Sequence, residues 1–219
     1  MQIHHIGAQA SLLNRFIAEA RDIKIQSDRM RFRTNIQRIA HILGYELSKA
    51  LSYRNTTVTT PLGEKEIPLI QNKVVICSIL RAGIAFHNGL LDYFDGAENA
   101  FVSAYRHHTG HGDDFEILVE YLSSPSLQGK TLLLADPMLA TGRSFMAAYD
   151  ALKKMGTPSE IHLLAVVGST PGIAAVEAYF PEDSHLWIAA MDDRLNEKGY
   201  IIPGLGDAGD LAYGPKLQH

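Results

Sequence analysis

The sequence predicts an α/β protein in which a parallel β-sheet is covered by helices on both faces. Segments with helical character separate strand-like runs that are apolar at nearly every position, which is typical of strands buried on both faces of a parallel sheet. The chain has 219 residues, 46% of them hydrophobic, which is enough for one domain over residues 1–219 with a sizeable core. The apolar runs are Lys73–Leu80, Thr131–Ala135, Glu160–Val167 and His185–Met191.

Residues 1–53 are expected to form N-terminal helices. Apolar residues recur at helical spacing over residues 11–25, and again from Ser27 to Leu51, where they indicate a second, amphipathic helix. We interpret the arginines of this second helix as a solvated polar face rather than an anion site. They are Arg29, Arg31, Arg33 and Arg38.

The remaining elements follow from the same patterns. Two short strands are predicted at 56–61 and 66–70, with a turn at Leu62–Gly63 between them. Beyond the apolar runs, a further strand is predicted at 99–105, and helices at 84–94, 144–155 and 172–179.

Residues 106–126 interrupt the alternation of strands and helices. The segment is polar and contains Gly110 and Gly112, and it becomes strand-like at Phe115–Leu122. A structured excursion between two core strands is often an active-site flap. A surface hairpin without a functional role is the alternative.

The turn from Asp136 to Ser144 is the most informative segment for function. A buried strand ends in an acid and a proline, and small and hydroxyl residues then lead into a helix. Such a turn offers free backbone N–H groups and the positive end of a helix dipole to a phosphate, while Asp136 lies where α/β sheets bind ligands. It is neither a Walker loop, because no Lys follows the glycine, nor a G-x-G-x-x-G turn. An ordinary strand-to-helix turn remains the alternative.

Three strings together carry a resemblance to a known family. Asp136-Pro137-Met138-Leu139-Ala140-Thr141-Gly142, Ile79–Gly83 and Gly199–Asp210 resemble the uracil phosphoribosyltransferases, and the similarity covers nearly the whole chain. The resemblance implies a fold like that of the type I phosphoribosyltransferases. It also implies that uracil and phosphoribosyl diphosphate are converted to UMP and diphosphate, with Mg²⁺ bound through the diphosphate and no metal site of the protein's own.

Two arginines are candidates for diphosphate binding. Arg81 lies between a buried strand and a helix that begins near Gly83, so it repeats the geometry of a phosphate turn with an added cation. The resemblance places both Arg81 and Arg106 on the diphosphate. The neighbouring histidines have no acid or Cys at helpful spacing, so we interpret them as loop residues and not as a metal site. They are His107, His108 and His111.

The resemblance implies that the turn from Asp136 to Ser144 binds phosphoribosyl diphosphate. Thr141, Gly142 and Ser144 would hold the 5′-phosphate, and Asp136 would face the ribose. Arg143 replaces the usual glycine of the family, and we expect it to have a negative φ because a left-handed arginine is strained. The turn residues assigned to this substrate are Asp136, Pro137, Met138, Leu139, Ala140, Thr141, Gly142, Arg143 and Ser144.

The C-terminal segment 197–219 is predicted to be a base-binding hood. Gly199–Gly214 is rich in glycine, and we expect it to form no regular element. The resemblance places Ile201, Gly206, Asp207 and Ala208 on uracil, with Asp207 also facing the phosphoribosyl diphosphate. The expected catalytic residues are thus Arg81, Arg106, Asp136 and Asp207.

Several residues are left outside the site, and the composition bears on partners and location. Asp192 and Asp193 follow the last strand and are interpreted as solvated acids, and Cys77 is interpreted as a buried structural thiol. A net charge of −4 gives no electrostatic footprint for nucleic acid. No leader segment or membrane-length apolar run is present, so we expect a cytoplasmic protein. We also expect a homo-oligomer, a dimer or larger, with small-molecule substrates.

Two alternatives stay open at this point. One is a phosphoribosyltransferase for another nucleobase, which the hood residues disfavour. The other is a pyrimidine-sensing regulator on the same fold that binds RNA, which would need a basic face and is disfavoured by the net charge.

Overall fold

The computed structural model describes residues 1–108 and 115–217, and it describes the side chains of residues 1–103 and 119–217. The central sheet has eight strands in the order β1-β10-β9-β7-β4-β5-β6, with β8 pairing to β9. Within the described part of this sheet only β5 and β6 pair antiparallel, so the predicted parallel sheet is confirmed. The strands are β1 (Gln2–His5), β4 (Val74–Leu80), β5 (Glu98–His108), β6 (Phe115–Ser123), β7 (Thr131–Ala135), β8 (Met138–Leu139), β9 (Glu160–Ser169) and β10 (His185–Asp192).

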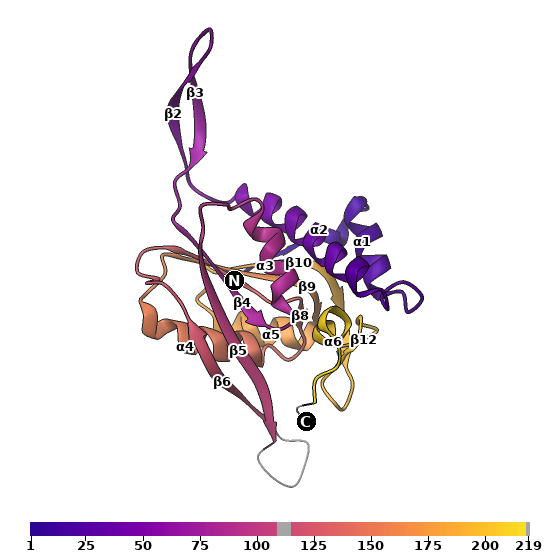
Figure 1. Ribbon diagram of the computed structural model, residues 1–219. Helices are drawn as coiled ribbons and strands as arrows, with labels where there is room; N and C mark the ends of the chain where they lie inside the picture. Colours follow the sequence, from indigo (N-terminus) through magenta and orange to yellow (C-terminus); the bar gives the residue numbers. More distant parts are fainter. Residues whose placement is uncertain (109–114, 218–219) are drawn as a thin grey trace.

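Helices cover both faces of this sheet (Figure 1). One face carries α1 (Leu12–Arg21), α2 (Arg29–Ser48) and α3 (Gly83–Leu91), and the other carries α4 (Arg143–Leu152) and α5 (Thr170–Tyr179). Successive residues of the buried strands pack on opposite faces: Ile76 packs with the first helix layer, whereas Val75 and Cys77 pack with the second. This is why those strands read as continuous apolar runs.

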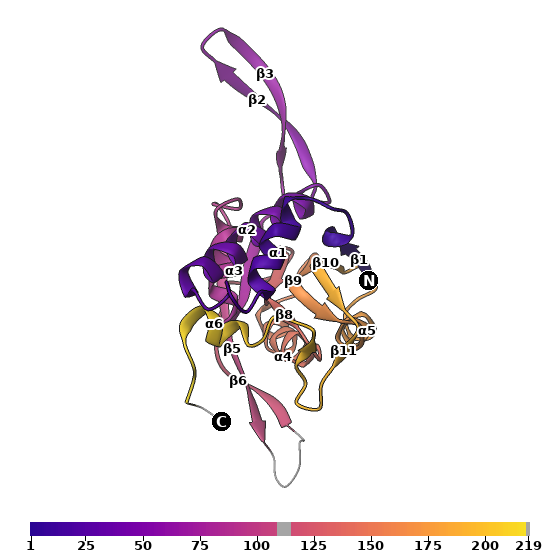
Figure 2. The ribbon, with the colours of Figure 1, turned by 90° about the vertical axis from the view of Figure 1, so that its right-hand side faces the viewer.

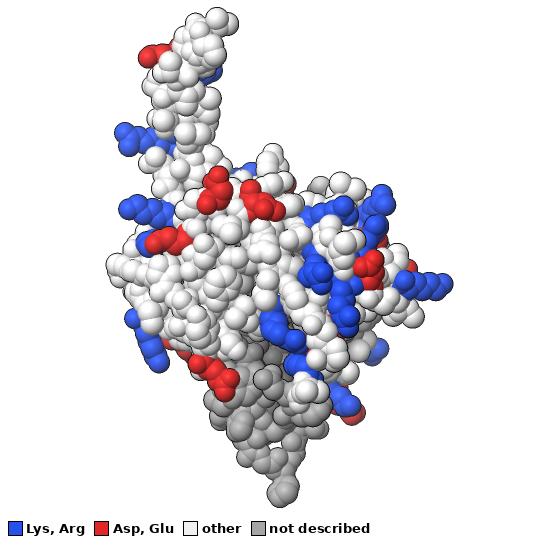
Figure 3. Space-filling model, in the orientation of Figure 1, with Lys and Arg blue, Asp and Glu red and all other residues white. Residues whose placement is uncertain are grey.

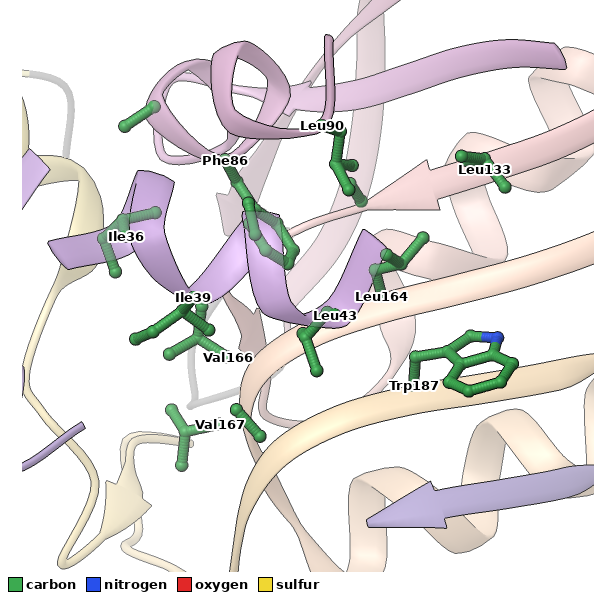
Figure 4. Close-up of a cluster of buried hydrophobic side chains, with 14 of the residues drawn as sticks. Ile36, Ile39, Leu43, Phe86, Leu90, Leu133, Leu164, Val166, Val167 and Trp187 are labelled. Atoms are coloured by element: carbon green, nitrogen blue, oxygen red, sulfur yellow. The ribbon is translucent and has the colours of Figure 1, made fainter. Parts of the chain in front are cut away.

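The N-terminal helices pack on the sheet through branched aliphatic side chains (Figure 4). Ile36, Ile39 and Leu43 of α2 meet Phe86 and Leu90 of α3 over the sheet, and all five are fully buried. Their strand partners include Leu133, Leu164, Val166 and Trp187. The first helix layer is therefore fixed to the strands whose carboxyl ends carry the candidate site.

Short elements complete the chain, and two of them differ from the expectations. β1 was not predicted, because Gln2–His5 has no apolar run and pairs at the sheet edge with β10. The expectation that 199–214 has no regular element is wrong: β12 (Ile201–Ile202) pairs with β11 (Arg194–Leu195), and α6 covers Ala208–Tyr213. The capping side chain of Asp207 starts this last helix despite the surrounding glycines.

A two-stranded arm projects from the body of the protein (Figures 1 and 2). β2 (Tyr53–Thr60) and β3 (Gly63–Ile70) pair only with each other, and nearly every residue in them is exposed. At the other end of the molecule, β5 and β6 form the hairpin expected as a flap, with β5 running on to His108. His107 and His108, which we interpreted as loop residues, lie in β5 instead, and His111 lies outside the described residues. In the part of the chain that the structure covers, no helix has the length and apolarity needed to cross a membrane.

Candidate functional site

The turn after β7 is held firmly against β9. The carbonyl of Pro137 accepts hydrogen bonds from the backbone N–H groups of Val166 and Val167 at 3.1 and 3.0 Å. Met138 and Leu139 then pair with β9 as the short strand β8. The turn is therefore an extension of the sheet rather than a free surface loop.

Gly142 lies at the beginning of α4 with a φ of 77°. A Cβ atom there would approach Cγ1 of Val176 to 2.9 Å and the carbonyl of Gly172 to 3.2 Å. Behind the turn, the Ser169 hydroxyl donates to the carbonyl of Ala140 at 2.5 Å and accepts from the N–H of Gly172 at 3.0 Å. Helix α5 thus supports the back of the turn, and the N-terminus of α4 faces the carboxyl edge of the sheet.

The prediction for Arg143 is confirmed. It begins α4, and no described residue other than glycine has a positive φ. The turn needs a left-handed residue one position earlier, at Gly142, so arginine is accommodated without backbone strain. Its side chain is exposed beside the helix N-terminus, and its N–H points to the Thr141 hydroxyl at 3.4 Å.

Asp136 is buried at the carboxyl end of β7, with an exposed fraction of 8%. Burial raises the pKa of its carboxyl from 3.8 to about 7; the N–H of Met138, 3.1 Å from Oδ1, opposes this rise, and the charge of Asp207 adds to it. A carboxyl that ionises near neutrality beside a phosphate turn is typical of a functional site.

Arg81 follows β4 directly, and the Leu80–Arg81 peptide bond is cis. Its guanidinium donates to Asp210 Oδ1 and to the carbonyl of Gly214, both at 3.1 Å. Its side chain keeps an exposed fraction of 41%. The Arg81 turn therefore lies next to the C-terminal segment, and its cation is available to an anionic ligand.

Asp207 caps α6 and faces the same space. Its Oδ1 accepts from the N–H of Asp210 at 3.0 Å, and its Oδ2 lies 3.1 Å from Lys216 Nζ. Partial burial pulls the pKa of Asp207 upward, but these hydrogen bonds and the charge of Lys216 hold it below its ordinary value. The two acids of the site thus have pKa values displaced in opposite directions.

The structure brings together most of the residues predicted for the site. A Cβ on Gly209 would lie 3.9 Å from the N atom of Ala82, which joins the C-terminal segment to the Arg81 turn. Ile201 and Ala208 are buried, whereas Gly206 is exposed with a φ of 91°. Arg106 lies in β5, but its side chain is outside the described residues.

Two interpretations from the sequence need correction. Asp192 is not a solvated acid: its exposed fraction is 9%, and Arg21 contacts both of its carboxylate oxygens. The arginines of α2 are not simply solvated either, because Arg31 pairs with Glu19 and Arg33 donates to the carbonyl of Ala212 at 2.7 Å. Figure 3 shows Lys and Arg side chains gathered on the surface over the N-terminal helices. No local sequence signal identifies these partners, and those of Arg21 and Arg33 lie more than 170 positions away in the chain.

A phosphate-type turn, a buried acid and a second, arginine-bearing turn at the carboxyl edge of a parallel sheet define the class of protein as phosphoribosyltransferase-like. The sequence matches the uracil phosphoribosyltransferase family over residues 8–215. A protein of Porphyromonas gingivalis named uracil phosphoribosyltransferase is 50% identical over 99% of this chain and 100% of its own. One of the same name from Pyrococcus furiosus is 37% identical over 88% of this chain and 82% of its own.

A solved structure has the same fold over nearly the whole chain. The structure of the AQ2163 protein from Aquifex aeolicus superimposes with a TM-score of 0.87 at 28% identity, and it covers 99% of this chain and 100% of that one. The chain belongs to the uracil phosphoribosyltransferase family. It is therefore a pentosyltransferase enzyme, as the motif resemblance predicted.

Proposed function

We propose that this site transfers the phosphoribosyl group of phosphoribosyl diphosphate to uracil, which yields UMP and diphosphate. The observation that carries the proposal is the meeting of three segments at one edge of the sheet. They are the Asp136–Ser144 turn, the Arg81 turn and the C-terminal segment around Asp207, joined by the Arg81–Asp210 contact and by the electrostatic coupling of the two acids.

Each segment suits one part of the two substrates. The N-terminus of α4, with Thr141, Ser144 and the cation of Arg143, suits the 5′-phosphate. Arg81 suits the diphosphate, because a guanidinium that is always charged stabilises the negative charge developing on the leaving group. Arg106 is proposed as a second diphosphate ligand on the family resemblance alone.

The base is proposed to bind the C-terminal segment through its main chain. Backbone N–H and C=O groups near Ile201, Gly206 and Ala208 supply both the donor that uracil O4 needs and the acceptor that N3–H needs. Cytosine presents the opposite polarity at that edge, so binding it would leave buried polar groups unpaired. Glycine at 206 allows the backbone to approach the base closely.

Asp136 and Asp207 are proposed to face the ribose hydroxyls and the Mg²⁺ that accompanies the diphosphate. Carboxylate oxygens suit Mg²⁺, which keeps much of its coordination for phosphate oxygens and water. Among the described residues, no three His, Cys, Asp or Glu side chains are grouped to hold a metal, so the proposal has the ion bound mainly through the substrate. When bound, Mg²⁺ supplies positive charge to the departing diphosphate.

A spectrophotometric assay with uracil, phosphoribosyl diphosphate and Mg²⁺ tests the proposal. We expect UMP to form from uracil, with little product from cytosine or hypoxanthine. Omitting Mg²⁺ should abolish turnover. Efficient use of another base with none of uracil would contradict the proposed substrate, and turnover of phosphoribosyl diphosphate without any base would contradict the proposed reaction.

A homo-oligomer is proposed on the properties of the arm. An isolated two-stranded hairpin is marginally stable in water, yet Tyr53, Leu69 and Ile70 of β2 and β3 are exposed at 46%, 44% and 39%. A second copy of the chain that covers them would stabilise the arm. Sedimentation of the wild type and of a Leu69→Lys variant tests this, because the variant should already be dissociated at protein concentrations at which the wild type is still an oligomer.

The cytoplasmic location that we expect from the sequence stays a prediction.

A further inference from the structure

A closed set of hydrogen bonds joins helix α1, strand β10 and the C-terminal segment. Arg21 donates from Nη1 and Nη2 to the two carboxylate oxygens of Asp192 at 2.7 and 2.9 Å. Nη1 also donates to the carbonyl of Gly204 at 2.8 Å, and the N–H of Gly204 donates to Asp192 Oδ2 at 3.0 Å. Both backbone groups of one buried glycine are therefore bonded to a single ion pair.

The pair is well shielded from water. The exposed fractions of the Arg21 and Asp192 side chains are 23% and 8%. A forked guanidinium matches a carboxylate through two parallel hydrogen bonds, which a lysine cannot reproduce. Next to it, Gln26 donates from Nε2 to the carbonyl of Leu205 at 3.3 Å. Arg21, the last residue of α1, and Gln26, which follows the helix, thus hold two successive carbonyls of the C-terminal segment.

The glycine that is held lies within the proposed uracil-binding segment. Gly204 has a φ of 59°, and a Cβ placed on it would come within 2.3 Å of the carbonyl oxygen of Ile201. The chain turns sharply here, so the position of Gly204 determines that of the Ile201 carbonyl. Gly206 follows two residues later with another positive φ.

We propose that Arg21 and Asp192 are positioning residues that hold the main chain of residues 201–206 in place to receive uracil. The inference rests on the function proposed above, because it concerns the base subsite of that same site. Neither residue touches the substrate in this scheme; both act through Gly204.

The effect should be confined to the base subsite. The Asp136–Ser144 turn is tied to β9 and α5, and the Arg81 turn follows β4. Asp192 reaches the beginning of α5 through its main chain: its carbonyl lies 3.4 Å from the Thr170 hydroxyl, and its backbone pairs with Ser169 at the end of β9. A change of the Asp192 or Arg21 side chain leaves those contacts in place.

Steady-state kinetics of Arg21→Lys and Asp192→Asn test the proposal. Arg15→Lys is the matched control, because Arg15 lies on the same helix and pairs with Glu19 instead. We expect the KM for uracil to rise about tenfold or more in both variants, which is the scale of a lost charge-assisted hydrogen bond. The KM for phosphoribosyl diphosphate should stay within about twofold of the wild-type value. The Asp136–Ser144 turn and the Arg81 turn, which are proposed to bind that substrate, are held by other contacts than the Arg21–Asp192 ion pair. Added guanidinium should partly restore uracil binding in Arg21→Ala, and it should leave the KM for uracil of Arg15→Ala, which is expected to equal that of the wild type, unchanged.

Hydrogen exchange of the backbone amides gives a readout that does not use the reaction. In Arg21→Ala and Asp192→Asn, the peptide that spans residues 201–206 should exchange at least about tenfold faster, because each variant breaks the ion pair to which both backbone groups of Gly204 are bonded. The peptides of the Asp136–Ser144 turn should be unchanged. A wild type that makes no UMP would refute the proposed function, and exchange alone would then decide the positioning role. Unchanged exchange at 201–206, or equal rises of both KM values, would overturn the inference.

Discussion

Replacing Asp136 with asparagine should stabilise the protein above neutral pH while it lowers activity. The carboxyl is buried at 8% exposure, and burial raises its pKa from 3.8 to about 7. A shift of roughly 3 pKa units corresponds to about 4 kcal/mol of unfavourable free energy for the ionised form in the folded state. Asparagine has nearly the same shape, keeps an oxygen to accept the Met138 N–H bond at 3.1 Å, and carries no charge.

The sign of the pH dependence follows from the direction of the shift. Because the folded state binds the proton more tightly than the unfolded state, the unfolding free energy of the wild type falls as the pH rises from about 4 to about 7, and this contribution is level above that range. The variant has no such loss. Its advantage should be near zero at about pH 4, about 2 kcal/mol near pH 5.5, and up to about 4 kcal/mol at pH 8, with relaxation of the site reducing the last figure.

Urea unfolding of both proteins between pH 4 and pH 8.5, without substrates or Mg²⁺, measures this difference directly. Asp193→Asn is a matched control, because Asp193 is an exposed acid that follows β10 and was not assigned to the site. It should leave the curve of the wild type unchanged. Parallel pH profiles for the wild type and Asp136→Asn would refute the reasoning, since they would mean that Asp136 is ionised in the folded state at no cost.

The remaining predictions concern the other parts of the site. Arg81→Ala should weaken transition-state binding by about 1.5–3 kcal/mol, measured as a fall in kcat/KM for phosphoribosyl diphosphate. The urea midpoint should change little, because the ion pair of Arg81 with Asp210 is partly exposed. An unaltered kcat/KM in the folded variant would remove Arg81 from the site. Gly142→Ala should destabilise the protein by more than about 1 kcal/mol in thermal unfolding, whereas Gly129→Ala, with a φ of 68° and nothing within 4 Å, should cost less. Asp207→Asn should lower turnover but keep the preference for uracil over cytosine; loss of that preference in paired kinetics would show that a side chain reads the base.

The sheet could be predicted from sequence because its signal is local. The strand expected at Thr131–Ala135 has those bounds in the structure, and β9 begins at Glu160 as expected. Strands buried on both faces must be apolar throughout, so their pattern shows in a few consecutive residues. β1 has no such pattern: its pairing with β10 depends on residues more than 180 positions away.

The candidate site was predictable where it consists of strand ends and turns. Asp136, Arg81 and Gly142 each follow a buried strand or precede a helix, and the parallel topology brings those ends to one edge. The partners of Asp192 could not be predicted in this way. Arg21 is only the last residue of a surface helix in the sequence, and its contact with Asp192 depends on how α1 packs on β10.

The two acids of the candidate site, Asp136 and Asp207, are stabilised to different extents by their surroundings. Asp207 receives hydrogen bonds from a helix N-terminus and a contact from Lys216, so its charge is stabilised before any substrate is present. Asp136 receives one backbone hydrogen bond and lies close enough to Asp207 to be repelled by it. A cation or a ribose hydroxyl between them would relieve that repulsion, so the cost of ionising Asp136 becomes binding free energy when the ligand arrives. The stability gained by Asp136→Asn and the activity lost by it then have the same physical origin.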